Sequence, residues 1–127
     1  MLNTGIKNTI TITVNNDKTA KAMGSGTLDV FATPAMVALM EQTAAESVQP
    51  FLDEGVTSVG TKINVEHLSA DPLGIEITCE SELSEIDGRK LCFEIICSDK
   101  CGIVGKAYHE RFLIKSESFM NKTNAKL

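Results

Sequence analysis

Residues 31–67 have the sequence FATPAMVALMEQTAAESVQPFLDEGVTSVGTKINVEH, and this stretch decides the fold. Thr33-Pro34 predicts a helix start, because Thr is a common capping residue and Pro is accepted in the first turn. The helix should run to about Phe51. Alternating apolar residues then predict a strand from Thr57 to Leu68. The residues expected on the buried face of this strand are Val59, Thr61, Ile63, Val65 and His67.

Short strands separated by turn signals make up most of the remaining chain. The expected strands are Asn8–Val14, Ile75–Ile86, a strand with Leu91, Phe93, Ile95 and Cys97 facing inward, and Ile103–Ile114. Thr19–Met23 is expected as a short additional strand, and the tail 116–127 as loosely ordered. One long helix among antiparallel strands predicts a single α+β domain over residues 1–127, with the helix packed against a five- to six-stranded antiparallel sheet.

Composition and charge exclude several classes of partner. The 127 residues carry a net charge of −5 and include no Trp, which argues against a nucleic-acid partner. No apolar run approaches the roughly 20 residues of a membrane span, and the segment MLNTGIKN lacks the features of a signal peptide. We therefore expect a cytoplasmic protein without a membrane partner.

The four cysteines are Cys79, Cys92, Cys97 and Cys101, and no two of them form a CxxC pair. The first three fall in apolar strand patterns, so we expect reduced, buried thiols. A zinc site that uses Cys97 and Cys101 would need further ligands, and the chain has only two histidines. We predict no metal site.

Glu41 is the unusual residue of the helix. The apolar arc contains Met36, Val37, Leu39, Met40, Ala44 and Val48. At about 100° per residue, Glu41 lies at the edge of this arc, between Val48 and Ala45. A carboxylate there loses water, so it is paired, at an interface or functional. The simpler alternative is a side chain that extends to solvent.

His67 ends the predicted strand on the side that faces the helix. A lone histidine there is more often a hydrogen-bonded core residue than a catalyst. A helix carboxylate and a strand imidazole that meet, however, form the acid–base pair that hydrolysis uses. Thr33 has two compatible interpretations: a helix cap, and a hydroxyl that positions water or a carbonyl at the positive end of the helix. The other histidine, His109, is interpreted as structural.

Gly60 interrupts the predicted strand, where glycine weakens pairing. Close approach of a ligand or of a partner backbone is one explanation, and a β-bulge is the other.

The segments that carry these residues resemble a known family. They are VFATPAMVALMEQTA, SVGTKINVEHLSADPLG, EIDGRKLCFEI and GKAYHERFLI. The chain is similar to the hotdog-fold acyl-CoA thioesterases, and most of all to the branch related to fluoroacetyl-CoA thioesterase. The resemblance covers about residues 31–114.

This resemblance implies a hotdog fold and metal-free, cofactor-free hydrolysis of an acyl-CoA thioester. It implies a homodimer whose sheets join edge to edge, with active sites at the subunit interface. The branch's catalytic set falls on Thr33, Glu41 and His67, and its substrate-binding positions fall on Gly60 and Arg111. The acyl group is expected to be small, but fluoroacetyl specificity does not transfer, because it depends on pocket-lining side chains.

The sequence leaves three alternatives to this function. A non-catalytic acyl-CoA-binding module on the same scaffold would bind CoA esters without turnover. A hotdog dehydratase also uses histidine and a carboxylate, but its helix motif is absent here. A structural interaction domain leaves the joint placement of the threonine, glutamate and histidine unexplained. The role of Glu41 as nucleophile or as base stays open.

Overall fold

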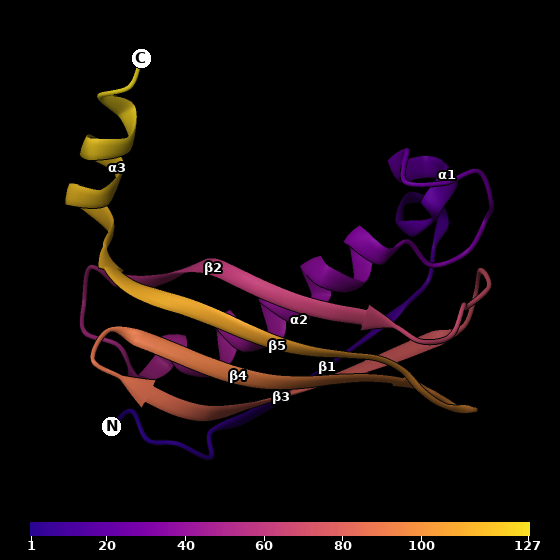
Figure 1. Ribbon diagram of the computed structural model, residues 1–127, viewed down its shortest axis with the longest axis horizontal. Coiled ribbons are helices and arrows are strands. Elements are labelled where there is room, and N and C mark those ends of the chain that lie inside the picture. Colours follow the sequence, from indigo (N-terminus) through magenta and orange to yellow (C-terminus); the bar gives the residue numbers. More distant parts are fainter.

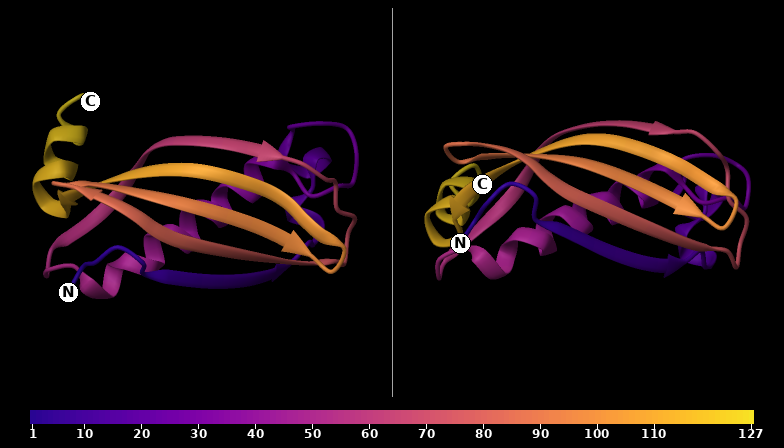
Figure 2. Two further views of the ribbon diagram at one scale, coloured as in Figure 1. Left: turned by 60° about the horizontal axis from the view of Figure 1, so that its bottom comes forward. Right: turned by 90° about the horizontal axis from the view of Figure 1, so that it is seen from below.

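A five-stranded antiparallel sheet curves around one long helix in the computed structural model, which describes residues 1–127 (Figure 1 and Figure 2). In chain order the elements are β1 (Lys7–Thr13), η1 (Asn16–Lys18), α1 (Ala20–Met23), α2 (Thr33–Val48), η2 (Gln49–Phe51), β2 (Val56–His67), β3 (Glu76–Asp87), β4 (Lys90–Asp99), β5 (Gly102–Lys115) and α3 (Ser116–Asn124). The predicted α+β architecture is therefore confirmed.

The sheet order places β2 at an edge. The strands lie in the order β1-β3-β4-β5-β2, and every neighbouring pair is antiparallel. β2 pairs with β5 on one side only, so its other side carries backbone N–H and C=O groups without strand partners. Figure 1 shows β2 along one edge of the sheet, with α3 rising beyond the beginning of that strand.

α2 forms because its sequence is rich in Ala, Leu, Met, Gln and Glu, which favour helix. Pro34 lies in the first turn, where its missing N–H is not needed. The α-helix ends at Val48, and a short 3-10 turn with Pro50 continues to Phe51. Gln49 then accepts a hydrogen bond from the Thr57 hydroxyl at 2.8 Å, which ties the helix end to β2.

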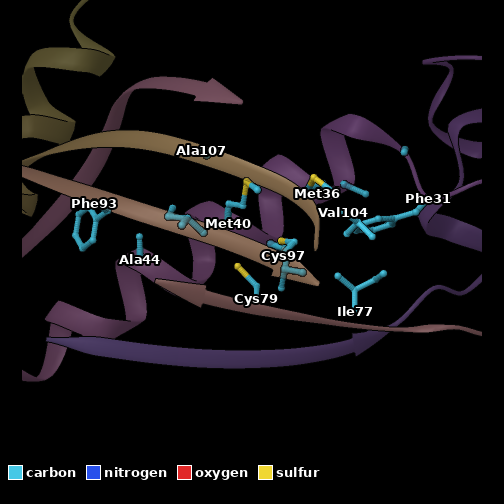
Figure 3. Close-up of a cluster of buried hydrophobic side chains, with 14 of the residues drawn as sticks. Phe31, Met36, Met40, Ala44, Ile77, Cys79, Phe93, Cys97, Val104 and Ala107 are labelled. Carbon is cyan, nitrogen blue, oxygen red and sulfur yellow. The ribbon is translucent and has the colours of Figure 1, made fainter. Parts of the chain in front are cut away.

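The core lies between α2 and the concave face of the sheet. Figure 3 shows Met36, Met40 and Ala44 of α2 over side chains of the central strands. The 18 residues of the core form one cluster, so α2 and the sheet share one apolar layer rather than two separate cores.

One local prediction of secondary structure is wrong. Residues Ala20–Met23 form the short helix α1, not a strand, because the Thr19 hydroxyl accepts from the Ala22 N–H and caps a helical turn. The tail, for which loose order was expected, contains the helix α3 from Ser116 to Asn124. No residue of α3 is buried, so this helix is regular but only lightly packed. No helix of the chain combines the length and the apolar character needed to cross a membrane.

Candidate active site

Thr33 and His67 meet where α2 begins and β2 ends. The Thr33 Oγ1 and the His67 Nδ1 are 2.8 Å apart, a hydrogen bond between residues 34 positions apart in the chain. The sequence suggested Thr33 as the capping residue, but Ala32 occupies that position and no side chain caps α2. The Thr33 hydroxyl therefore makes a hydrogen bond with the His67 imidazole and does not cap α2.

The second imidazole nitrogen has no partner. His67 Nε2 is buried and makes no hydrogen bond within the chain. The ring packs edge-on against Phe31, with centroids 6.3 Å apart. Burial lowers the pKa of His67 below its usual value, and the Ser69 backbone partly opposes this shift. The result is a neutral imidazole at pH 7 with one nitrogen held and the other available.

A cavity of about 330 Å³ opens beside this pair. Its lining residues are Ala20, Ser25, Val30, Phe31, Thr33, His67, Leu68, Ser69 and Ala70. The walls are mostly small or apolar apart from the hydroxyl and the imidazole. This composition is typical of a small-molecule site with few orienting polar groups.

Glu41, Gly60 and Arg111 form a second group farther along the same elements. Glu41 Oε2 lies 3.7 Å from Arg111 Nη1, and the Glu41 side chain is 41% exposed. Gly60 and Arg111 are paired directly across β2 and β5. A Cβ on Gly60 would collide with the Glu41 carboxylate, so glycine is what lets this carboxylate reach the edge strand.

The strand register shifts at the same point. The pairing of β2 with β5 is irregular between Gly60 and Lys62. The explanation of Gly60 by a bulge or strand irregularity is therefore confirmed, whereas the group that approaches this glycine is the Glu41 side chain and not a ligand or a partner backbone. The shift also makes two of the predicted inward positions wrong, because Ser58 rather than Val59 is buried on the inner face and Thr61 is exposed. Beyond the shift, Ile63, Val65 and His67 face the helix layer as expected.

Sequence reasoning missed the residues that hold Arg111. The Arg111 Nε donates to Ser58 Oγ at 2.8 Å, and Nη2 donates to the Ser58 carbonyl at 3.0 Å. Nη1 lies 3.2 Å from His109 Nε2, while His109 Nδ1 lies 2.7 Å from the Lys62 carbonyl. Because Arg111 only donates, Nε2 accepts and Nδ1 carries the proton. The signal that could have found His109 is its position two residues before Arg111, which puts both on one face of β5. No such signal pointed to Ser58, because the register shift changes the alternation in β2.

Burial determines the charge states of His109 and Arg111. Desolvation lowers the pKa of His109, so the ring is neutral and accepts from the guanidinium. Desolvation also lowers the pKa of Arg111, and the Glu41 carboxylate opposes that shift. The guanidinium stays charged because its reference pKa is far above neutrality. Arg111 is thus a fixed buried cation aimed at Glu41.

Within one chain the two groups do not meet. Thr33 and Glu41 are eight residues apart in α2, which is about 12 Å along the helix axis. Gly60 and His67 are seven residues apart in β2, or about 23 Å. The structure therefore brings Thr33 to His67, and Glu41 to Gly60 and Arg111, but it does not bring Glu41 to His67. The expected contact between this carboxylate and this imidazole is absent from the single chain.

Replacing Gly60 with alanine should separate activity from stability. The added Cβ collides with the end of the flexible Glu41 side chain, so the carboxylate moves and the backbone does not. We expect the free energy of unfolding in urea to change by no more than about 1–3 kcal/mol. If this carboxylate takes part in catalysis, its displacement should lower kcat by about 10²-fold. An unchanged kcat would contradict the placement of Glu41 in the active site.

The titratable residues show no metal centre. No group of three or more His, Cys, Asp or Glu side chains has a geometry that could hold a metal ion. All four cysteines are free, and Cys79, Cys92 and Cys97 are buried, as the strand patterns predicted. Cys101 is exposed in the turn between β4 and β5.

The sequence matches known thioesterases. The family model described as "FlK: Fluoroacetyl-CoA-specific thioesterase" matches residues 14–117. The fluoroacetyl-CoA thioesterase of Streptantibioticus cattleyicolor is 38% identical over 98 residues, which cover 77% of this chain and 70% of that protein.

Solved structures agree with the sequence match. A structure of the fluoroacetyl-CoA thioesterase FlK has 32% identity and a TM-score of 0.94, and the match covers 100% of this chain and 98% of that one. A hot-dog-like protein from Thermanaerovibrio acidaminovorans has 21% identity and a TM-score of 0.90, with 98% and 92% of the two chains covered. At that identity the likeness concerns the fold alone, and it confirms the predicted hotdog fold.

Proposed function

The chain belongs to the family of fluoroacetyl-CoA-specific thioesterases, and from this premise we propose that Thr33, Glu41 and His67 catalyse the hydrolysis of a small acyl-CoA. Family membership makes the chain an acyl-CoA thioesterase, as the resemblance predicted. The observation that carries the assignment of residues is the 2.8 Å contact between Thr33 and His67, which leaves a buried nitrogen of the imidazole free.

The hydrogen bond to Thr33 holds His67 by Nδ1. In our proposal Nδ1–H donates to Thr33 Oγ1, which leaves the Nε2 lone pair free, since the partner of one ring nitrogen decides where the proton lies. Nε2 accepts a proton from water as the water oxygen attacks the thioester carbonyl. The C–S bond then breaks, and the imidazolium returns the proton to the CoA thiolate. The products are the free acid and CoA.

A carboxylate beside His67 stabilises the imidazolium that forms when Nε2 accepts the proton. We propose that this carboxylate is Glu41 of a second subunit. β2 is an edge strand with unpaired backbone groups, which favours pairing with another copy. A twofold axis makes the two β2 strands antiparallel, so the end of one lies beside the start of the other. His67 would then approach Glu41 of the partner subunit, and each active site would contain residues of both chains.

Arg111 and Gly60 are proposed as substrate-binding residues of this composite site. The buried guanidinium orients Glu41 and adds a fixed positive charge near the thioester, where negative charge develops during attack. Gly60 leaves the space into which the Glu41 carboxylate extends. Glu41 then either activates water together with His67, or attacks the carbonyl itself: in that case the C–S bond breaks, the CoA thiolate leaves, and water hydrolyses the transient anhydride to release the acid and restore the carboxylate.

A panel of acyl-CoA esters of graded chain length, assayed for release of free thiol, tests the function. We expect turnover without added metal or cofactor, and the highest kcat/KM on short acyl chains. Saturable binding of every ester without thiol release would instead indicate a binding module. Four unpaired cysteines fit a reducing compartment, and we propose that the enzyme works in the cytoplasm.

The pH dependence of kcat/KM should follow the deprotonation of His67. Because burial lowers the pKa of this imidazole from the ordinary 6.5, the neutral, active form should already dominate at pH 7. We expect kcat/KM to rise with pH on the acidic side and to be level above about pH 6.5. Initial rates between about pH 5 and pH 8 check this. A rise centred well above pH 7 would exclude His67 as the base.

A further inference from the structure

A second cavity, of about 610 Å³, lies between the end of β5, the turn between β3 and β4, and α3. It is larger than the cavity beside His67 and falls within the range of about 300–1,000 Å³ that is usual for small-molecule sites. Thr33 and His67 do not line it. The catalytic mechanism described above does not use it.

Its lining combines positive charge with apolar surface. Arg89, Lys115 and Lys122 supply three cations. Val56, Leu113 and Phe119 supply the apolar walls, and no carboxylate is among the lining residues. The whole chain has 17 acidic and 12 basic residues, so this lining differs in sign from the protein as a whole. A ligand with phosphates and a flat apolar ring suits such a surface.

Residues that line the cavity lie on the same face of the sheet as the Glu41 group. Three alternate register pairs of β2 and β5 are Gly60 with Arg111, Ser58 with Leu113, and Val56 with Lys115. Residues two apart in a strand face the same side. The pair Gly60 and Arg111, which contacts Glu41, and the pair Val56 and Lys115, which lines the cavity, therefore lie on the same face. One further pair of that face, Ser58 and Leu113, lies between them.

The distance along β5 between Arg111 and Lys115 matches the length of the pantetheine arm of CoA. Arg111 and Lys115 are four residues apart in β5, or about 13 Å. The pantetheine arm of CoA has a backbone about as long as four extended residues, roughly 15 Å from the thiol to the diphosphate. A thioester held beside Glu41 thus places the phosphates of CoA at the three cations.

We propose that this cavity binds the nucleotide part of CoA, with Arg89, Lys115 and Lys122 on the phosphates and Phe119 against the adenine. The inference rests on the proposed function and adds to it the site that distinguishes CoA esters from shorter thioesters. The Phe119 side chain is available for this contact because the residue is 37% exposed. α3 has no buried residue, so substitutions there leave the core intact.

The test compares two esters of the same acyl group, the acyl-CoA and the S-acyl-pantetheine, which lacks the nucleotide. The variant Arg89→Ala/Lys115→Ala/Lys122→Ala should raise KM for the acyl-CoA by about 10- to 100-fold, because charged contacts to phosphate are lost. Its kcat, and its kcat/KM on the pantetheine ester, should equal the wild-type values. Phe119→Ala should raise KM for the acyl-CoA alone by about 5- to 10-fold.

The matched control removes three cations elsewhere, as Lys7→Ala/Lys18→Ala/Lys100→Ala, and should leave both esters unaffected. An unchanged KM of the cavity variant for acyl-CoA would overturn the proposal, and so would an equal loss on both esters. If the wild-type protein hydrolyses neither ester, the proposed function fails instead. Calorimetric titration with CoA then decides the inference, since the cavity variant must bind about 10-fold or more weakly than wild type to support it.

Discussion

Replacing His67 with alanine should lower kcat for acyl-CoA hydrolysis by about 10²–10⁴-fold, the usual effect of losing a general base. The structure leaves this residue with one nitrogen held by Thr33 and the other buried and free, so no neighbouring group replaces it as base. KM should change much less, because in this mechanism the imidazole acts mainly in the transition state. Steady-state rates on the best acyl-CoA of the graded panel measure both quantities.

A loss of packing must be separated from a loss of chemistry. The imidazole packs against Phe31, so the alanine variant is also expected to lose some stability. His67→Gln fills more of the space and keeps a group that can bond to Thr33, yet it offers no base of suitable pKa. We expect this variant to unfold near the wild-type temperature and still to show the low kcat. A wild-type kcat in both variants would remove His67 from the mechanism.

Thr33→Ala should have a smaller effect than either His67 variant. The hydroxyl orients the imidazole and selects its tautomer in our proposal, but it does not carry the proton. Because Thr33 does not cap α2, the stability of the helix should change little. If Thr33→Ala lowered kcat as far as His67→Ala, the hydroxyl would instead be the nucleophile that the imidazole activates.

The local pattern of the sequence predicted most elements, because each had a strong periodic signal. α2 is apolar at helical spacing, and the strands alternate on both sides of clear turn signals. α3 had no such signal, since no residue of this helix is buried and nothing imposes an apolar stripe. Thr19 could equally precede a strand or cap a turn. Its role as a cap depends on tertiary context.

The candidate site shows the limit of reasoning from alternation. Counting every second residue gave Val59 and Thr61 the same face as His67, but the irregular pairing after Gly60 changes that count. Glu41 was correctly placed at the edge of the apolar arc. The partner of Glu41 was not predicted, because Arg111 comes close to this carboxylate only through the pairing of β2 with β5. A sequence alone does not reveal at which residue the register of a strand shifts, and therefore which side chains beyond that residue face inward.

Mixing two inactive variants should restore activity, and this is the second large effect we expect. Consider a heterodimer of one His67→Ala chain and one Glu41→Gln chain, isolated with two different affinity tags. If each active site takes His67 from one subunit and Glu41 from the other, one of the two sites lacks both residues and the other is intact. The heterodimer should then have about half the activity of the wild-type dimer, although each parent homodimer is nearly inactive.

The geometry of a single chain makes this test decisive. Thr33 and Glu41 lie about 12 Å apart along the helix axis, with His67 next to Thr33 and Arg111 next to Glu41. A site within one chain would leave every site of the heterodimer lacking one residue, and activity would stay at the level of the parent variants. A heterodimer of His67→Ala with wild type controls for subunit exchange, since both arrangements predict about half activity for it. Failure of the mixed variants beside success of this control, or a protein that is monomeric at assay concentration, would show that Glu41 does not reach His67 across a β2 edge.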